Sequence, residues 1–277
     1  MRVRGGLAPL VLVIVGIWLT TCGPGLESEQ PGTAARVLAV IDGDTLAVET
    51  DAGEQRVRLI GIDAPEAPHG GRPGQRGHDR ATAFLERLVG GAEVALLRDS
   101  VGDDTDRYGR LLRHVILPDG RNAARELLAA GLVTAYPRFP FRDLEVYVAD
   151  EARARAARRG LWNPASMAEI SWLEAADHIG EAVRVRGTLV GGRCLAKVCF
   201  LNFHRDYKRH LSLVLFKPVW LLFPDEPDAY YRGREVVVSG RITAYRGRPQ
   251  ILLTAPSQIE FLPPRKVNPP AYPSSYR

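Results

Sequence analysis

The sequence predicts a mainly β protein with some α-helix, built as two successive small barrels of which only the first has helices packed beside it. Short runs that alternate apolar and polar residues, separated by turn residues, occur along most of the chain. Helical spacing of apolar residues is confined to three segments between residues 78 and 160. The chain has 277 residues, 45% of them hydrophobic, which is enough for one or two buried cores.

The first domain opens with three strands. The runs RVLAVI (36–41) and TLAVET (45–50) flank Asp42-Gly43, and Asp-Gly between alternating apolar residues is a strong hairpin signal. A second turn leads into QRVRLIGI (55–62). We therefore expect an antiparallel meander in which Asp42 serves the turn rather than a ligand site.

Helices alternate with the remaining strands of this domain. The first helix is predicted over 78–91, with a buried face made of Ala81, Phe84, Leu85 and Leu88. Strand-like runs at 92–97 and 109–117 precede a second helix at 121–130, and an extended run at 132–136 follows it. Five curled strands with helices beside them correspond to an OB-type five-stranded barrel.

The third helix is predicted over 144–160, where arginines in the last turn and a terminal glycine match the usual end of a helix. Its expected buried stripe consists of Leu144, Val148, Ala152 and Ala156. We expect its arginines on a solvated face, with Glu151 and Arg155 paired one turn apart.

The chain changes character beyond Asn163, where β-branched or alternating runs follow one another without a long amphipathic helix. These runs predict a second, smaller OB-like β-barrel over 168–263, and the Pro-rich segment 264–277 is expected to be a tail. Such barrels bind single strands through aromatic stacking and basic grooves. The candidates for accessory nucleic-acid contacts are Tyr207, Lys208, Arg209, Tyr245, Arg246 and Arg248. The alternative is that these residues are hairpin loops of a packing domain.

The amino terminus has the composition of an export signal. Two arginines precede an apolar run from Leu7 to Leu19, which small residues follow up to Cys22. The run is shorter than the roughly 20 apolar residues that span a bilayer, so we expect 1–22 to be a signal peptide and 23–35 a linker. LTTC resembles a bacterial lipoprotein cleavage box, which makes Cys22 a candidate for lipidation. The protein is expected to be exported, either anchored to the cell envelope or secreted.

Two further cysteines, Cys194 and Cys199, lie close together in a strand-like stretch. An oxidising compartment would allow them to form a disulfide, and the alternative is that both are free, small apolar residues. No second Cys or His pair at ligand spacing accompanies them, so a metal site is not expected there.

The overall charge favours polyanionic partners. The chain carries 37 Lys and Arg against 32 Asp and Glu, a formal charge of +5, and its pI is about 9.3. Nucleic acid and anionic lipid both fit this balance, and charge alone does not distinguish them.

Acidic and basic side chains occur at the ends of the first strands. Asp44 follows the first turn, and Asp63 and Glu66 follow the third strand, so strand pairing should bring all three to one rim of the barrel. Arg58 lies on that third strand, and Arg110 follows the DRYG turn. We expect both guanidinium groups to face the same opening.

This mixture suits the cleavage of a phosphodiester bond. Two carboxylates with a backbone carbonyl and waters are suitable ligands for Ca²⁺, and Asp44 and Asp63 are the proposed carboxylates. A third, unligated carboxylate such as Glu66 can act as a base or orient the attacking water. Forked arginine donors match phosphoryl oxygens bidentately, which a lysine does not.

Five motifs then carry a family resemblance. VIDGDTLAV, VRLIGIDAPE, DRYGRLLRHV, LLAAGLVTAY and ARRGLW occur in order between Arg36 and Trp162. They resemble the successive motifs of the thermonuclease family, the staphylococcal-nuclease-like enzymes, and five ordered motifs are more specific than any one of them. The resemblance implies a nuclease domain, which we place at 36–165.

The resemblance also implies residue roles. The family's calcium-ligand positions match Asp44, Asp63 and the backbone carbonyl of Ala64. Its catalytic positions match Arg58, Glu66 and Arg110. Tyrosines of the nucleotide pocket match Tyr108 and, with a slip of one residue, Tyr136. The implied activity is that of a calcium-dependent endonuclease on DNA and RNA that leaves 3′-phosphate ends.

Two features depart from the family pattern. Ala64 stands where some members have threonine, a change that a backbone ligand tolerates. The segment from Asp99 to Asp106 is more acidic than a loop that faces substrate should be.

The sequence therefore predicts a monomeric, exported calcium-dependent endonuclease that acts on DNA, with RNA as a further substrate and no obligate protein partner. One rival is a non-catalytic nucleic-acid-binding protein built from two OB-type barrels. Family relatives of that kind lack some of the catalytic acids and arginines, and here none is missing. A surface scaffold that recruits a protein through the second barrel is a further rival, for which the sequence has no positive feature.

Overall fold

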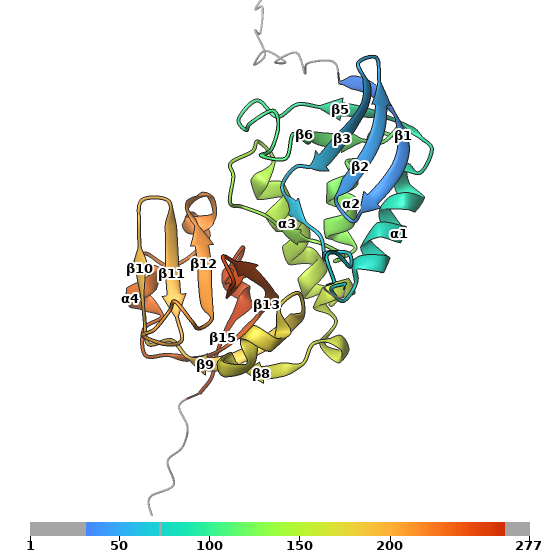
Figure 1. The fold of residues 1–277 in the computed structure, drawn as a ribbon. Coiled ribbons are helices and arrows are strands. Elements are labelled where there is room, and N and C mark those ends of the chain that lie inside the picture. Colours follow the sequence, from blue (N-terminus) through green and yellow to red (C-terminus); the bar gives the residue numbers. More distant parts are fainter. Residues whose placement is uncertain (1–31, 72–73, 264–277) are drawn as a thin grey trace, which may run out of the picture. The chain divides into compact units, whose positions relative to one another are not determined.

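The computed structural model describes residues 32–71 and 74–263 (Figure 1). The predicted signal peptide, the lipidation candidate Cys22 and the Pro-rich tail lie outside the described residues. The first strand begins at Thr33, inside the segment predicted to be a linker. Within the described ranges, the helices are all too short or too polar to cross a membrane.

Five strands close into a barrel in the order β1-β2-β3-β6-β5, which confirms the predicted OB-type architecture. The strands are β1 (Thr33–Asp42), β2 (Thr45–Thr50), β3 (Gly53–Leu59), β5 (Glu93–Leu97) and β6 (Leu111–Ile116). Neighbours pair antiparallel except β3 and β6, which run parallel. Alternate residues of β3 point inward, so Val57 and Leu59 are buried in the core.

The third predicted strand is interrupted, contrary to the continuous run expected over 55–62. Gly61 has a φ of 76°, and the chain then forms β4 (Ile62–Asp63), which pairs with β7 (Thr134–Ala135). A Cβ at Gly61 would lie 2.3 Å from the ring of Phe141, so only glycine fits both the conformation and the space. This turn places Asp63 on a separate short strand.

Three helices accompany the barrel: α1 (His78–Val89), α2 (Ala123–Ala129) and α3 (Leu144–Ala156). In α1, Ala81, Leu85 and Val89 are buried, while the predicted Phe84 and Leu88 pack against the core from partly buried positions. The side chain of Asn122 caps α2 by accepting from two backbone N–H groups at 2.9 and 3.3 Å.

The prediction for α3 was wrong about the members of its buried stripe and about the solvent exposure of the Glu151–Arg155 pair. Ala156 is exposed, and the buried residues include Tyr147 and Ala154 in addition to the predicted Leu144 and Val148. Glu151 and Arg155 do pair, at 3.1 Å, but their side chains are only 2% and 10% exposed. The reason is that Thr254, from the C-terminal part of the chain, donates a hydrogen bond to Glu151 and covers this face.

The C-terminal strands form a second, eight-stranded sheet, connected in the order β10-β11-β12-β14-β13-β9-β8, with β15 paired to β13. They are β8 (Glu169–Ser171), β9 (Ala182–Thr188), β10 (Gly191–Cys194), β11 (Val198–Asn202), β12 (Ser212–Phe216), β13 (Glu235–Tyr245), β14 (Arg248–Leu252) and β15 (Ile259–Phe261). A short helix, α4 (Pro227–Tyr230), precedes β13.

The connectivity of this sheet repeats that of the first barrel. Only Leu189 and Val190 separate β9 from β10, so one bent segment pairs with β13 at one end and with β11 at the other. The pair β12–β14 is parallel, as β3–β6 is in the first barrel. The sheet therefore has an OB-like strand order, although its hydrogen-bonded path among the described strands is open.

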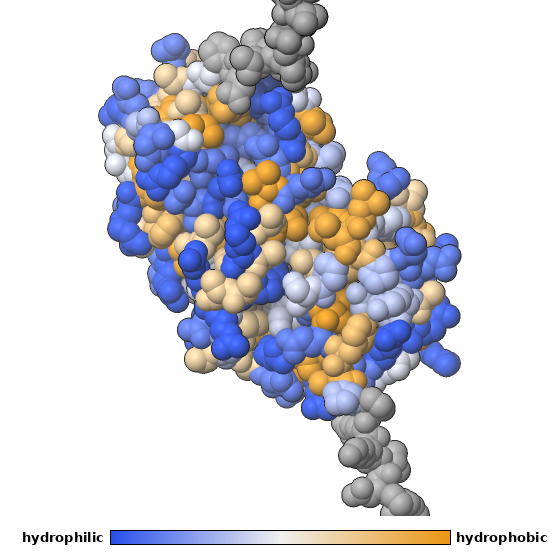
Figure 2. All heavy atoms as spheres, turned by 180° about the vertical axis from the view of Figure 1, so that it is seen from behind, coloured by the Kyte–Doolittle hydropathy of each residue, from blue (hydrophilic) through white to orange (hydrophobic). Residues whose placement is uncertain are grey.

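The surface mixes hydrophilic and hydrophobic residues. On the face drawn in Figure 2, blue hydrophilic residues predominate and orange hydrophobic residues occur between them. Large hydrophobic side chains that are exposed include Tyr108, Phe139, Leu173 and Leu221. The ring of Tyr108, one of the predicted substrate contacts, is therefore accessible from solvent.

Candidate active site

Asp44 and Arg58 meet because β2 and β3 are neighbours. Thr45 lies opposite Arg58 in the strand register, so Asp44, one residue earlier, lies beside the guanidinium group. Arg58 Nη2 is 2.9 Å from Asp44 Oδ2. The same carboxylate oxygen accepts the backbone N–H of Ala64 at 2.8 Å, and Asp44 is only 6% exposed. Asp44 therefore ties the start of β2 both to β3, through Arg58, and to the loop that follows β4, through Ala64.

Arg58 also contacts the second predicted ligand. Its Nη2 lies 3.7 Å from Asp63 Oδ1, and its two terminal nitrogens donate to the carbonyls of Leu59 and Ile62 at 3.0 and 2.9 Å. The guanidinium group thus lies between the two carboxylates predicted to bind calcium and is held by the backbone on both sides of Gly61.

Asp42 occupies the turn, as predicted. Its Oδ1 accepts the backbone N–H of Asp44 at 3.0 Å, which is an Asx-type turn contact. Burial raises the pKa of Asp42 to about 6, and the negative charge of Asp44 acts in the same direction.

Arg110 approaches the same strand end from β6. Its Nη1 donates to Thr45 Oγ1 at 3.2 Å, while its Nε and Nη2 both lie 2.7 Å from Asp106 Oδ2. Burial acts to raise the pKa of Asp106, but the N–H donors of Arg110 and Tyr108 outweigh it and lower this pKa. Arg58 and Arg110 therefore contact the adjacent residues Asp44 and Thr45, as expected for one shared opening.

Glu66 lies in the loop after β4, and its side chain is exposed. Gln75 holds its backbone, since the Glu66 N–H donates to Gln75 Oε1 at 3.0 Å and the Glu66 carbonyl accepts the Gln75 N–H at 2.8 Å. Loss of hydration raises the pKa of Glu66 and the charge of Asp44 raises it further, against the opposing charges of Arg58 and Arg110. Glu66 is therefore within electrostatic reach of both arginines.

The groups predicted to hold calcium are bound by Arg241, which the sequence prediction missed. This residue lies on β13 and is only 4% exposed. Its Nη1 donates to the Ala64 carbonyl at 3.0 Å and to Gln75 Oε1 at 2.9 Å, and its Nη2 forms an ion pair with Asp63 Oδ2. The available signal was an arginine inside the strand-like run EVVVSGRI, which is rich in valine. Burial lowers the pKa of Arg241 to about 10, so the group stays charged at neutral pH.

The donor set itself suits calcium, because two carboxylates and one carbonyl supply oxygen alone. In this arrangement, however, the Asp63 carboxylate and the Ala64 carbonyl accept hydrogen bonds from the guanidinium group of Arg241. The possible ligand atoms of Asp44, Asp63 and Glu66 do not all lie within 4.8 Å of one another. Among the residues that the structure describes, three side chains that meet this distance are Cys194, Cys199 and Asp228.

Cys194 and Cys199 are joined by a disulfide bond between the paired strands β10 and β11. This is the first of the two arrangements that the sequence left open. Because both sulfur atoms are used in the bond, neither is a thiolate that could hold a metal beside Asp228.

The two predicted pocket tyrosines lie in different surroundings. Tyr108 is 67% exposed, and Arg110 lies over its ring at 5.5 Å from the centroid. Tyr136 follows β7, and its backbone N–H donates to the Gly61 carbonyl at 2.9 Å, next to β4. Tyr108 thus adjoins Arg110, whereas Tyr136 adjoins the strand of Asp63.

The accessory candidates gather at one end of the second sheet. β12 and β14 run parallel with Ser212 opposite Gln250, so the segments just before them share an edge. One segment carries Tyr207, Lys208 and Arg209, and the other carries Tyr245, Arg246 and Arg248. The ring of Tyr245 is not open to solvent on all sides, because Arg138 of the first half lies 4.9 Å from its centroid.

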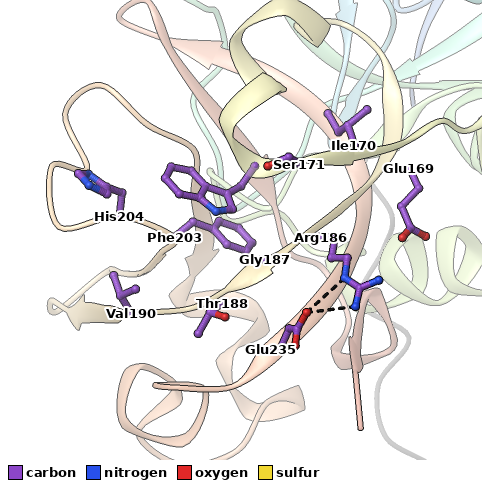
Figure 3. Close-up of a pocket in the computed structure, with 11 residues that line it drawn as sticks. Glu169, Ile170, Ser171, Arg186, Gly187, Thr188, Val190, Phe203, His204 and Glu235 are labelled. Carbon is purple, nitrogen blue, oxygen red and sulfur yellow. Dashed lines mark hydrogen bonds and ion pairs between the residues drawn. The ribbon is translucent and has the colours of Figure 1, made fainter. Parts of the chain in front are cut away.

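A cleft of about 610 Å³ lies elsewhere on this sheet (Figure 3). Its walls come from β8, β9, the start of β13, the segment just after β11 and the 3₁₀ turn Trp172–His178. Arg186 and Glu235, on the neighbouring strands β9 and β13, pair at its wall at 3.1 Å. The rings of Trp172 and His204 are stacked at 5.7 Å. The sequence prediction missed this cluster because its members lie on separate strands.

The acidic segment from Asp99 to Asp106 is explained by internal pairing. Asp99 is 4% exposed and accepts from His114 at 3.0 Å and from the backbone N–H of Arg142 at 3.0 Å. Asp104 lies 2.9 Å from Arg113 and 3.1 Å from Arg98. Asp104 and Asp106 thus pair with local arginines, and Asp99 pairs with a histidine inside the fold.

Comparisons with known proteins confirm the predicted family. A family model described as staphylococcal nuclease homologue matches residues 56–164. A thermonuclease of Staphylococcus hyicus is 31% identical over 171 residues, which cover 58% of this chain and 98% of that protein. An uncharacterized endonuclease of Escherichia coli O157:H7 is 32% identical over 158 residues, which cover 57% of this chain and 89% of that protein. The family model ends before β8, so it does not include the second sheet.

Proposed function

Because the chain belongs to the staphylococcal nuclease family, we propose that it is an endonuclease that hydrolyses phosphodiester bonds of DNA and also of RNA. The observation that carries the proposal is the convergence of Arg58 and Arg110 on the adjacent residues Asp44 and Thr45. Glu66 is close enough for the charges of Asp44 and of both arginines to act on it. A base and two forked cations around one opening are what in-line attack on a phosphodiester requires.

Glu66 is the group that accepts a proton from the attacking water or orients it. It lies on a loop whose backbone is fixed at two points by Gln75, which positions the carboxylate while leaving it exposed to solvent. Its raised pKa makes it a better proton acceptor than an ordinary surface glutamate.

The two arginines stabilise the charge that develops on the phosphoryl oxygens. The contacts of Arg110 with Asp106 and Thr45 use three of its five N–H donors, so two are left for a phosphate oxygen. Arg58 is held more fully, and its ion pair with Asp44 makes it a fixed positive charge at the rim. Removal of one such donor commonly costs about a hundredfold or more in rate.

We further propose calcium as the cofactor, held by Asp44, Asp63 and the carbonyl of Ala64. The donor chemistry of these residues supports this choice. When bound, the ion would supply positive charge to the phosphoryl oxygens beyond that of the arginines. The proposed products carry 3′-phosphate ends.

Product analysis tests the proposed activity. Residues 23–277 are incubated with end-labelled single-stranded DNA at saturating Ca²⁺, and internal cleavage with phosphatase-sensitive 3′ ends is expected. Products with 3′-hydroxyl ends would contradict the proposed bond cleavage. Glu66→Gln serves as the matched inactive chain.

One observation favours a second candidate, a nucleic-acid-binding protein without catalysis. Arg241 holds Asp63 and Ala64 in the arrangement described above, so the ligand groups are not open to a metal there. Binding of single-stranded DNA without any cleavage at saturating Ca²⁺ would support this candidate over the nuclease.

Export is proposed on the sequence alone. The charged, apolar and small-residue segments that end at Cys22 support a signal peptide, and the LTTC sequence supports attachment to the membrane through that cysteine. Labelling cells with a fatty-acid analogue tests this proposal: label on the mature chain that disappears in Cys22→Ser is expected, and an unlabelled mature chain would rule out the anchor.

A further inference from the structure

The side chain of Arg241 contacts two of the three groups that would hold a calcium ion. Its Nη2 pairs with the carboxylate of Asp63 and lies 3.4 Å from the Asp63 carbonyl, while its Nη1 donates to the Ala64 carbonyl at 3.0 Å. These are two of the three groups assigned to calcium. An N–H donor and a cation both require the lone pairs of these oxygens, so they cannot use the same ones together.

Arg241 is not placed to clamp a substrate phosphate. Its two terminal nitrogens carry four N–H groups, and the contacts with Asp63, Ala64 and Gln75 account for them. The remaining Nε–H is buried and has no hydrogen-bond partner. The residue is therefore a counter-charge for the acids and not a third phosphate-binding arginine.

The second sheet holds Arg241 firmly in this position. Arg241 lies opposite Ala182 in the β9–β13 pairing, and the backbone of the next residue, Ile242, exchanges hydrogen bonds with Gly180 and Glu181 at 2.7 and 2.9 Å. Because the arginine is 4% exposed, it cannot leave the acids by a side-chain rotation into solvent alone. Its release requires β13 to move away from the Asp63 loop.

The contact also reaches Glu66. Gln75 Oε1 accepts from Arg241 Nη1 at 2.9 Å and from the backbone N–H of Glu66 at 3.0 Å. One amide oxygen thus links the arginine of the second sheet to the loop that carries the proposed base. If Arg241 were displaced, Gln75 Oε1 would lose the hydrogen bond from Arg241 and keep the one from the Glu66 N–H.

We propose that Arg241 is an internal cation that closes the nuclease site, so that calcium binds only when the second sheet releases this side chain. The proposal rests on the calcium site proposed above, and it gives the C-terminal sheet a function: it controls access of the metal to Asp63 and Ala64. An ion that binds only the released state has an apparent affinity reduced by the fraction of molecules in that state.

Calcium titration by isothermal calorimetry, without nucleic acid, tests the proposal. Arg241→Met removes the charge and keeps an unbranched apolar side chain, so we expect at least a tenfold lower Kd for Ca²⁺ than in the wild-type chain. The matched control is Arg184→Met on the adjacent strand β9, whose partners are the exposed Glu260 and Glu169, and its Kd should equal that of the wild type. Equal Kd values for Arg241→Met and wild type, or no binding by either, would overturn the proposal.

A second measurement uses the unmodified sequence and does not depend on how well the variant folds. Phenylglyoxal labels accessible arginines, and peptide mass spectrometry locates the label. Arg241 should be protected without Ca²⁺ and become labelled at saturating Ca²⁺, while the exposed Arg107 should be labelled in both conditions. Continued protection of Arg241 at saturating Ca²⁺ would contradict the release step.

The two proposals fail in different ways. If Arg241→Met binds Ca²⁺ more tightly but neither chain cleaves DNA, internal closure stands and the nuclease proposal is wrong. If the wild-type chain cleaves DNA with Ca²⁺, while Arg241→Met has the wild-type Kd for Ca²⁺ and Arg241 of the wild-type chain stays protected from phenylglyoxal at saturating Ca²⁺, the nuclease stands and internal closure is wrong.

Discussion

Asp44 and Arg58 form an ion pair of 2.9 Å whose side chains are only 9% and 15% exposed. Removal of one partner of a buried pair leaves an uncompensated charge, which commonly costs about 3 kcal/mol or more. This pair connects the start of β2 to β3, and Asp44 also accepts the Ala64 N–H of the loop after β4, so the pair supports the geometry of the site as well as its charge.

We therefore expect Arg58→Ala to lose both stability and activity. Its free energy of unfolding, measured by urea titration, should fall by about 3 kcal/mol because Asp44 loses its partner. The control is Arg56→Ala, on the same strand but exposed, which should change stability by less than about 0.5 kcal/mol. An Arg58→Ala chain as stable as wild type would show that this ion pair does not hold the site together.

Glu66→Gln separates chemistry from binding. The substitution preserves size and removes the proton acceptor, so cleavage should slow by about a hundredfold or more. The Kd for single-stranded DNA, measured by fluorescence anisotropy, should change less than threefold. Glu54→Gln, an exposed acid on β3, is the control for the loss of one negative charge. Equal losses in rate and binding for Glu66→Gln would assign Glu66 a structural role.

Arg110→Lys tests the forked donor. Lysine keeps the charge but loses the two-point contact with Asp106 and the reach to Thr45, so kcat should fall by about a hundredfold. Arg107→Lys, the exposed neighbour two residues before Gly109, should keep a kcat close to that of wild type. If both variants cleave at the wild-type rate, a point charge is sufficient at this position.

Asp99 should make stability depend on pH. Burial acts to raise its pKa, but hydrogen bonds from His114 and from the N–H groups of Arg142 and Val101 outweigh burial and lower the pKa below its usual value of 3.8. An acid with a lowered folded-state pKa stabilises the fold above its unfolded pKa, and this contribution is lost as the pH falls through the folded value.

The expected result is that Asp99→Asn is less stable than wild type by about 1–3 kcal/mol at pH 7, and that the gap narrows as the pH falls below about 4. Thermal unfolding of both chains between pH 7 and pH 2.5 measures it. A gap that is independent of pH would mean that the charge of Asp99 does not contribute.

The sequence predicted the first barrel and the convergence of its charged residues because these depend on local signals. Asp42-Gly43 fixes the hairpin of β1 and β2, and the next turn, which ends at Gly53, joins β2 to β3 in the register that places Thr45 opposite Arg58. Alternation of apolar residues predicted the strands of the second sheet in the same way.

The sequence could not predict what depends on contact between distant segments. Arg241 is 178 residues away from Asp63, and nothing in the pattern around either residue names the other. The same holds for Glu151, which was expected on a solvated helix face and is covered by Thr254. The break of the third strand at Gly61 was missed because it depends on a distant residue. The ring of Phe141, far along the chain, leaves room only for glycine at this turn.

Calcium-dependent cleavage of DNA is tested most directly by the rate at which residues 23–277 cleave single-stranded DNA. The rate is measured with 10 mM Ca²⁺, roughly a saturating concentration for a site of this kind, and again with excess EGTA. We expect rapid internal cleavage with Ca²⁺ and loss of at least about 99% of the rate with EGTA, which corresponds to the hundredfold cost of removing one electrostatic donor. Equal rates in the two conditions, or no cleavage in either, would contradict it.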